Sequence, residues 1–166
     1  MQSSKTIIRS LLLLSFVFFG IANSSCTTND NKKGAYYTGK YENLFTDLLG
    51  IDATEVNQKI EKAFNQLFHG NDANERVYYP VEPDMAYMLD VINNDVRSEG
   101  ISYGMMISVQ LDKKEEFDRL WKWADTYMRH KSGQRENYFA WHTTPGGVKL
   151  DSNSASDGEI GFVLAR

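Results

Sequence analysis

The sequence of 166 residues has little of several residue types, and each shortage excludes a class of protein. One cysteine and three prolines exclude a disulfide-stapled fold, a zinc ribbon and a proline-rich linker protein. Positive charge is not in excess either, because 18 Lys and Arg residues stand against 22 Asp and Glu residues. Since nucleic-acid-binding proteins carry a strongly basic surface, the net charge of −4 argues against a nucleic-acid partner.

The motifs of nucleotide cofactors, serine nucleophiles and metal sites are missing as well. The sequence holds no P-loop, no dinucleotide-binding glycine motif and no G-x-S-x-G. Its three histidines, His69, His130 and His142, lack the i, i+4 spacing of a metal-binding pair. We therefore predict neither a cofactor nor a metal site.

The longest apolar run lies near the N-terminus, at residues 11–22, behind the cations Lys5 and Arg9. It is shorter than the about 20 residues that cross a membrane, and it is typical of an export signal. The single cysteine, Cys26, follows closely and resembles the lipidated first residue of a bacterial lipoprotein. Asn23 departs from the usual aliphatic residue at that position, so plain secretion is the alternative.

These features divide the chain into three parts. We predict a signal peptide at residues 1–25, a polar tether at 26–35 and a folded domain at 36–166. The exported protein would lie at the cell surface, in the periplasm or outside the cell. Its contact with a membrane would be the lipid anchor alone.

Hydrophobic periodicity predicts that the folded domain is all-α, built from successive antiparallel helices. The predicted helices cover residues 41–49, 53–69, 102–111, 114–130 and 157 onward. Asp52 and Ser156 are the expected caps, and Gly50 and Gly70 end the first two helices. The segments between them are predicted to be loops, with a short extended run at residues 138–141.

One candidate catalytic segment is residues 94–106 (NDVRSEGISYGMM), at the start of a buried helix. The helix dipole there favours a charged Glu99, whereas apolar neighbours favour a neutral one. A carboxyl group kept protonated near neutral pH by burial can act as a general acid. The alternative is a capping carboxylate paired with Arg97.

Residues 154–159 (SASDGE) place Asp157 and Glu159 at the start of the last predicted helix. Two carboxylates beside a glycine can bind sugar hydroxyls or activate water. The alternative is an ordinary helix cap with solvated acids.

Aromatic residues are plentiful, at 13% of the chain. Near residues 138–142 (YFAWH), Tyr138 and Trp141 can offer ring faces on which a sugar stacks, and Tyr103 is a further candidate. The alternative is that these rings pack in the core.

Taken together, these segments resemble glycoside hydrolase family 8. Residues 94–106 are similar to the family segment that carries the catalytic acid, and ASDGE at 155–159 resembles the family signature, with Glu159 where many members have Asp. Residues 68–79 (FHGNDANERVYY), and residues 109–118 together with Trp121, are similar to the subgroup of reducing-end xylose-releasing exo-oligoxylanases.

The resemblance implies an (α/α)6 barrel and a role for each matching residue. Glu99 would be the general acid, and Asp157 the carboxylate that binds the sugar ring and stabilises its distorted transition state. Trp141, Tyr103, Arg97 and Tyr138 would bind substrate. The family mechanism inverts the anomeric centre and needs a second carboxylate as base. No residue of this chain matches that base.

A barrel of twelve helices needs roughly 200 residues, so we expect residues 36–166 to be the N-terminal part of a larger catalytic domain and to be inactive alone. The predicted function is hydrolysis of β-1,4 bonds in xylo-oligosaccharides, with cellulose, lichenan and chitosan as other family substrates. The alternative is a glycan-binding surface lipoprotein without catalysis. The sequence leaves the oligomeric state and the exo or endo mode open.

Overall fold

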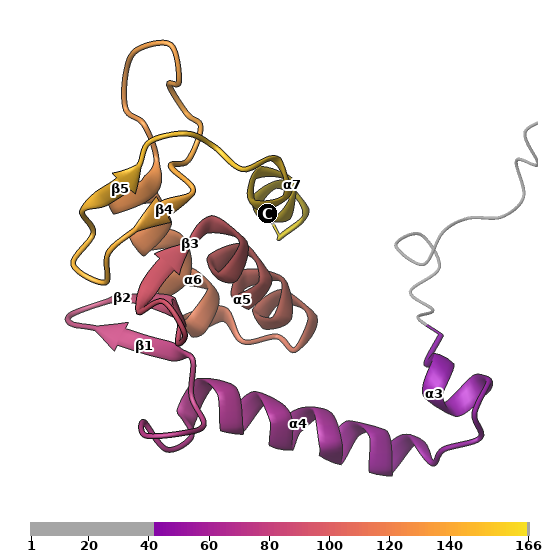
Figure 1. Ribbon diagram of the computed structural model, residues 1–166. Coiled ribbons are helices and arrows are strands. Elements are labelled where there is room, and N and C mark those ends of the chain that lie inside the picture. Colours follow the sequence, from indigo (N-terminus) through magenta and orange to yellow (C-terminus); the bar gives the residue numbers. More distant parts are fainter. Residues whose placement is uncertain (1–41, 166) are drawn as a thin grey trace, which may run out of the picture.

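The computed structural model describes residues 42–165 (Figure 1). The predicted signal peptide, the tether and Cys26 lie outside the described residues. The described elements, in chain order, are α3 (Leu44–Asp47), α4 (Ala53–His69), β1 (Tyr78–Val81), β2 (Met85–Asp90), β3 (Asp95–Arg97), α5 (Ser98–Gln110), α6 (Lys114–Trp123), η1 (Ala124–Met128), β4 (His142–Thr143), β5 (Lys149–Asp151) and α7 (Ser156–Ala165).

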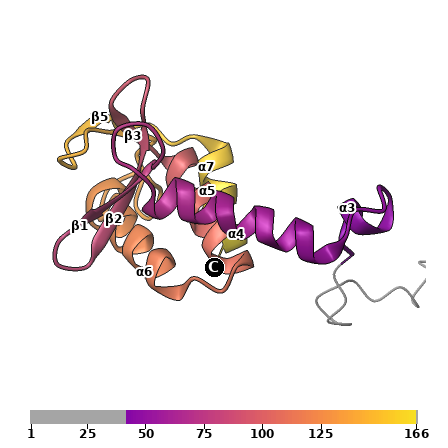
Figure 2. The same cartoon turned by 90° about the horizontal axis from the view of Figure 1, so that it is seen from below.

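Helix α4 follows the periodicity of the sequence, whereas the helix before it does not. Asp52 caps α4, because its Oδ1 accepts hydrogen bonds from the backbone N–H groups of Thr54 (2.8 Å) and Glu55 (3.2 Å). The stripe of α4 buries Val56, Phe64 and Phe68. The helix predicted before it is shorter than expected, since α3 has four residues and none of them is buried. Figure 2 shows α3 and the adjoining end of α4 reaching away from the rest of the fold.

A five-stranded antiparallel sheet in the order β1-β2-β3-β4-β5 corrects the predicted all-α fold. The segment 71–83, predicted as loop, contains β1, which pairs with β2 from Tyr78↔Met88 to Val81↔Met85. The strands have two to six residues, too short for alternation to stand out in the sequence. Pro80 is tolerated because β1 is an edge strand. The described fold is therefore a mixture of helices and sheet.

The core forms where α5 packs between α6, α7 and strand β2. Its fully buried large side chains include Ile101 and Met105 of α5 with Leu120 and Trp123 of α6. The predicted helix 114–130 is α6 followed by one turn of π-helix, η1. No helix among residues 42–165 is both long and apolar enough to cross a membrane.

Candidate active site

Two glycines of α7 bring the N-terminal turns of α5 and α7 together. A β-carbon added at Gly158 would lie 2.8 Å from Ser98 Cβ, closer than real β-carbons come to a neighbouring atom. One turn later, a β-carbon added at Gly161 would lie similarly close to the side chain of Ser102. Because both contacts run in the same direction along the two helices, α5 and α7 are parallel and begin at the same end (Figure 1). Glu99 and Asp157 both neighbour the first of these contacts, since Glu99 follows Ser98 and Asp157 precedes Gly158.

Both candidate carboxylates belong to the first turn of their helix. Glu99 is partly buried, and Ser98 Oγ donates a hydrogen bond to its Oε2 (3.0 Å). Asp157 is exposed, and its Oδ1 accepts from the Gly158 N–H (3.0 Å). The positive end of a helix dipole faces each group. The pair therefore combines one shielded and one solvent-facing carboxylate at the same end of two helices.

A surface depression of about 280 Å³ adjoins Glu99. Its lining brings together three predicted site residues, Arg97, Glu99 and Tyr103, with neighbours from β2. Tyr103 lies one helical turn after Glu99 and its side chain is 53% exposed. A ring at that position can contact a sugar bound beside Glu99.

Backbone hydrogen bonds hold Trp141 in place near the depression. Its N–H donates to the Asn153 carbonyl (2.8 Å), and its carbonyl accepts from the Ser98 N–H (2.9 Å). The Arg97 guanidinium lies 5.7 Å from the centroid of the indole ring. Arg97 thus joins Trp141 to the depression that contains Glu99.

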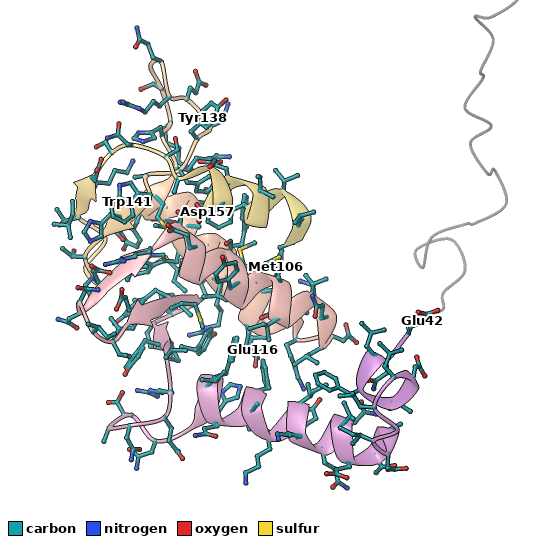
Figure 3. All side chains as sticks on the ribbon, turned by 45° about the vertical axis from the view of Figure 1, so that its right-hand side comes forward. Glu42, Met106, Glu116, Tyr138, Trp141 and Asp157 are labelled. Carbon is teal, nitrogen blue, oxygen red and sulfur yellow. The ribbon has the colours of Figure 1, made fainter. Side chains whose placement is uncertain are left out.

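Tyr138 stands apart from this group. It is 54% exposed, and its backbone bonds to His130 and Arg135 in the segment that follows η1. Figure 3 shows Tyr138 at the protruding loop, whereas Trp141 and Asp157 lie closer to the start of α5. The structure therefore brings Arg97, Glu99, Tyr103 and Trp141 together, with Asp157 at the adjacent helix end.

A hydrogen-bonded network behind the site was not identified from the sequence. Buried Asp95 accepts hydrogen bonds from Arg97 Nε (3.1 Å) and Nη2 (3.3 Å), and its Oδ2 lies 2.8 Å from His142 Nε2. The bond to Asp95 raises the pKa of Arg97. Arg97 also pairs with Asp90 (3.3 Å), so its ion pairs go to β2 and β3 instead of to Glu99. Within residues 42–165, no three His, Cys, Asp or Glu side chains are grouped to hold a metal ion.

Glu159, predicted with Asp157 as a carboxylate that binds sugar or activates water, has a structural role that the sequence did not predict. Its Oε1 accepts from the Phe139 N–H (2.7 Å), which ties α7 to the segment that carries Trp141. Burial raises the pKa of this carboxyl, although the bond from Phe139 opposes that effect. The sequence signal was the family signature, in which Glu159 is the last residue.

Comparison with known proteins shows which family the chain resembles. The model of "Glycosyl hydrolases family 8" matches residues 89–165, the part of the chain that holds the depression, Trp141 and the contact between α5 and α7. Over these residues the chain is similar to glycosyl hydrolase family 8. The family resemblance inferred from the two sequence segments is thereby confirmed.

Family 8 relatives match most of the described residues. The reducing-end xylose-releasing exo-oligoxylanase Rex8A of Paenibacillus barcinonensis is 53% identical over 137 residues, which are 82% of this chain and 36% of that protein. A reducing end xylose-releasing exo-oligoxylanase of Halalkalibacterium halodurans is 43% identical, over 80% of this chain and 34% of that protein. An endoglucanase of Cellulomonas uda is 34% identical, over 51% of this chain and 24% of that protein.

Solved structures of family 8 agree with the fold. Rex8A complexed with xylose superimposes with a TM-score of 0.74 at 53% identity, covering 80% of this chain and 35% of that chain. This chain therefore spans about a third of the length of the relatives it matches.

Proposed function

We propose that the protein to which this chain belongs hydrolyses β-1,4 bonds in xylo-oligosaccharides. The observation that carries the proposal is the parallel contact of α5 and α7, which sets Glu99 and Asp157 at the same end of two helices. The substrate class is taken from the relatives, two of which are named as exo-oligoxylanases. The completed fold we propose is the (α/α)6 barrel.

In this proposal Glu99 is the general acid and protonates the glycosidic oxygen. Its position in the lining of the depression suits a group that must reach the glycosidic oxygen of a bound sugar. The exposed Asp157 binds the sugar ring and stabilises positive charge on it. The Trp141 ring stacks on a sugar, while Tyr103 and Arg97 contact it from the depression.

The proposed reaction inverts the anomeric centre. A water molecule attacks from the ring face opposite Glu99, activated by a second carboxylate about 6.5–9.5 Å from the acid. The proton from Glu99 goes to the leaving sugar, and the base takes the proton of the water. We place that base in the part of the relatives' length that this chain does not span.

The variant Glu99→Gln of the full-length protein tests this function, with xylotetraose as substrate. We expect kcat to fall by at least about 10²-fold, because general acid catalysis contributes 10²–10⁴-fold. Binding of xylotetraose should persist, since the amide keeps the shape of the side chain. The matched control is Glu55→Gln, an exposed glutamate in the first turn of α4, which should leave kcat unchanged.

Two results would overturn parts of the proposal. Full activity of Glu99→Gln would remove Glu99 as the acid. Binding of xylotetraose by the unmodified protein without any hydrolysis would favour the glycan-binding alternative. The anomer formed first, observed by NMR, reports inversion or retention.

We further propose export with lipidation at Cys26, outside the described residues. Labelled fatty acid should enter the protein in a bacterial host and should not enter the variant Cys26→Ala. Equal labelling of both proteins would contradict lipidation at this residue.

A further inference from the structure

Asp95 is a buried carboxylate to which the proposed reaction assigns no role. It lies on β3 and its side chain is 7% exposed. A charge this deeply buried requires partners, and Asp95 has them in Arg97 and His142. Both partners are side chains that also touch Trp141.

The sheet register creates this arrangement. Arg97 of β3 and His142 of β4 are paired residues, so their side chains lie on the same face of the sheet. The bond between His142 Nε2 and Asp95 Oδ2 (2.8 Å) holds the imidazole in one orientation. The imidazole then stacks on the Trp141 indole, with ring centroids 4.7 Å apart and planes inclined by 29°.

The Trp141 indole thus has two neighbouring side chains, Arg97 and His142, that both bond to Asp95. Arg97 lies 5.7 Å from the indole centroid, and both Arg97 and His142 bond to Asp95. Asp151 of β5 is paired with His142 of β4 in the sheet, and it interacts with the Trp141 side chain. Since the backbone of Trp141 is already held by Ser98 and Asn153, what this network adds is the orientation of the ring.

We propose that Asp95 and His142 are positioning residues that orient Trp141 for stacking on a sugar. The pair acts through Trp141 and Arg97 and does not touch the reacting atoms. This proposal rests on the proposed function, because it assumes that the sugar binds beside Glu99. It assigns His142 and Asp95 a part in substrate affinity that is separate from proton transfer.

The first test measures KM and kcat for xylotetraose in the full-length protein carrying His142→Ala. We expect KM to rise about 3- to 10-fold, the effect of one aromatic pair, with kcat changed less than KM. Asp95→Asn should act in the same direction. The control is His69→Ala, which removes a similar histidine–carboxylate contact (His69 Nε2 to Glu116 Oε1, 3.0 Å) away from the site and should leave KM unchanged.

A double-mutant cycle separates positioning from a general loss of structure. In the background Trp141→Ala, the further change His142→Ala should add little to KM, because the group it orients is gone. The proposal would be overturned if His142→Ala raised KM by the same factor in the parent protein and in the Trp141→Ala background. It would also be overturned if His142→Ala alone left KM unchanged. Either result leaves the assignment of Glu99 intact, since that depends on the kcat of Glu99→Gln.

A second readout does not need turnover. The near-UV circular dichroism that Trp141→Ala removes should also diminish in His142→Ala and persist in His69→Ala. An undiminished Trp141 signal in His142→Ala would overturn the proposal even if the protein hydrolysed no xylo-oligosaccharide.

Discussion

A β-carbon placed on Gly161 of α7 would lie 2.6 Å from the Cβ atom of Ser102 of α5. Gly158 approaches Ser98 nearly as closely, so α7 presents bare backbone to α5 at two successive turns. At both turns α5 contributes a small serine. This contact determines where Asp157 lies relative to Glu99, because each carboxylate neighbours one of the touching residues.

This contact predicts that the stability lost in Gly161→Ala can be recovered by one substitution at Ser102 and not by another. Gly161→Ala should destabilise the full-length protein by about 1–3 kcal/mol, the usual effect of overpacking. Adding Ser102→Gly should recover part of this loss, because it removes both close atoms. Adding Ser102→Ala should not, because the Cβ at 2.6 Å remains. Chemical unfolding of the four proteins measures these differences.

Gly100→Ala is the matched control on the facing helix. A β-carbon there would lie 3.5 Å from Met88 Cβ, an ordinary contact. Since alanine is the better helix former, this variant should be as stable as the parent or more stable, by up to about 1 kcal/mol. If Gly100→Ala destabilised the protein as much as Gly161→Ala, the close contact between α5 and α7 would not be the cause of the loss of stability.

The two exposed tyrosines predicted to bind substrate should differ in their effect on substrate binding. Tyr103 lines the depression beside Glu99, whereas Tyr138 lies in the segment after η1. We expect Tyr103→Ala to raise KM for xylotetraose several-fold, with a smaller effect of Tyr138→Ala. Steady-state kinetics of both variants checks this order. A larger effect of Tyr138→Ala would indicate that the substrate binds nearer the protruding loop.

Glu159 should make stability depend on pH in a defined direction. Burial raises its pKa above the ordinary value of 4.5, so the folded state holds the proton more tightly than the unfolded state. The stabilising effect of the proton is complete below 4.5 and is lost as the pH rises through the raised pKa. Relative to Glu159→Gln, the parent protein should therefore lose unfolding free energy over that interval. The exposed control Glu136→Gln should show no such divergence.

Asp52 should act in the opposite direction. Hydrogen bonds from the backbone N–H groups of Glu55 and Thr54 lower its pKa, so the charged form stabilises the folded state. That contribution is complete above the ordinary pKa and is lost as the pH falls through the lowered value. Asp52→Asn should keep the cap but remove this acid sensitivity, whereas Asp52→Ala should weaken α4 at every pH. Unfolding curves between neutral and acid pH distinguish the three proteins.

Sequence periodicity predicted α4 well because this helix buries one continuous stripe of side chains. α4 begins directly after Asp52 and ends before Gly70, as the cap and the glycine indicate. The segments around Glu99 and Asp157 were recognisable because their residues are adjacent in the chain. The sheet was missed because its strands are short, and β3 pairs with a strand that follows two intervening helices.

The sequence by itself determined helix α4 with its Asp52 cap and the two acidic motifs, because local hydrogen bonding and one-sided burial specify such features. The predicted cap Ser156 is instead the first residue of α7. The tertiary structure alone decided which of these residues meet. Pairing of Arg97 with His142 across β3 and β4, and the bare face of α7 at Gly158 and Gly161, depend on contacts between distant segments. No local pattern records such contacts, since they arise only when the core closes around α5.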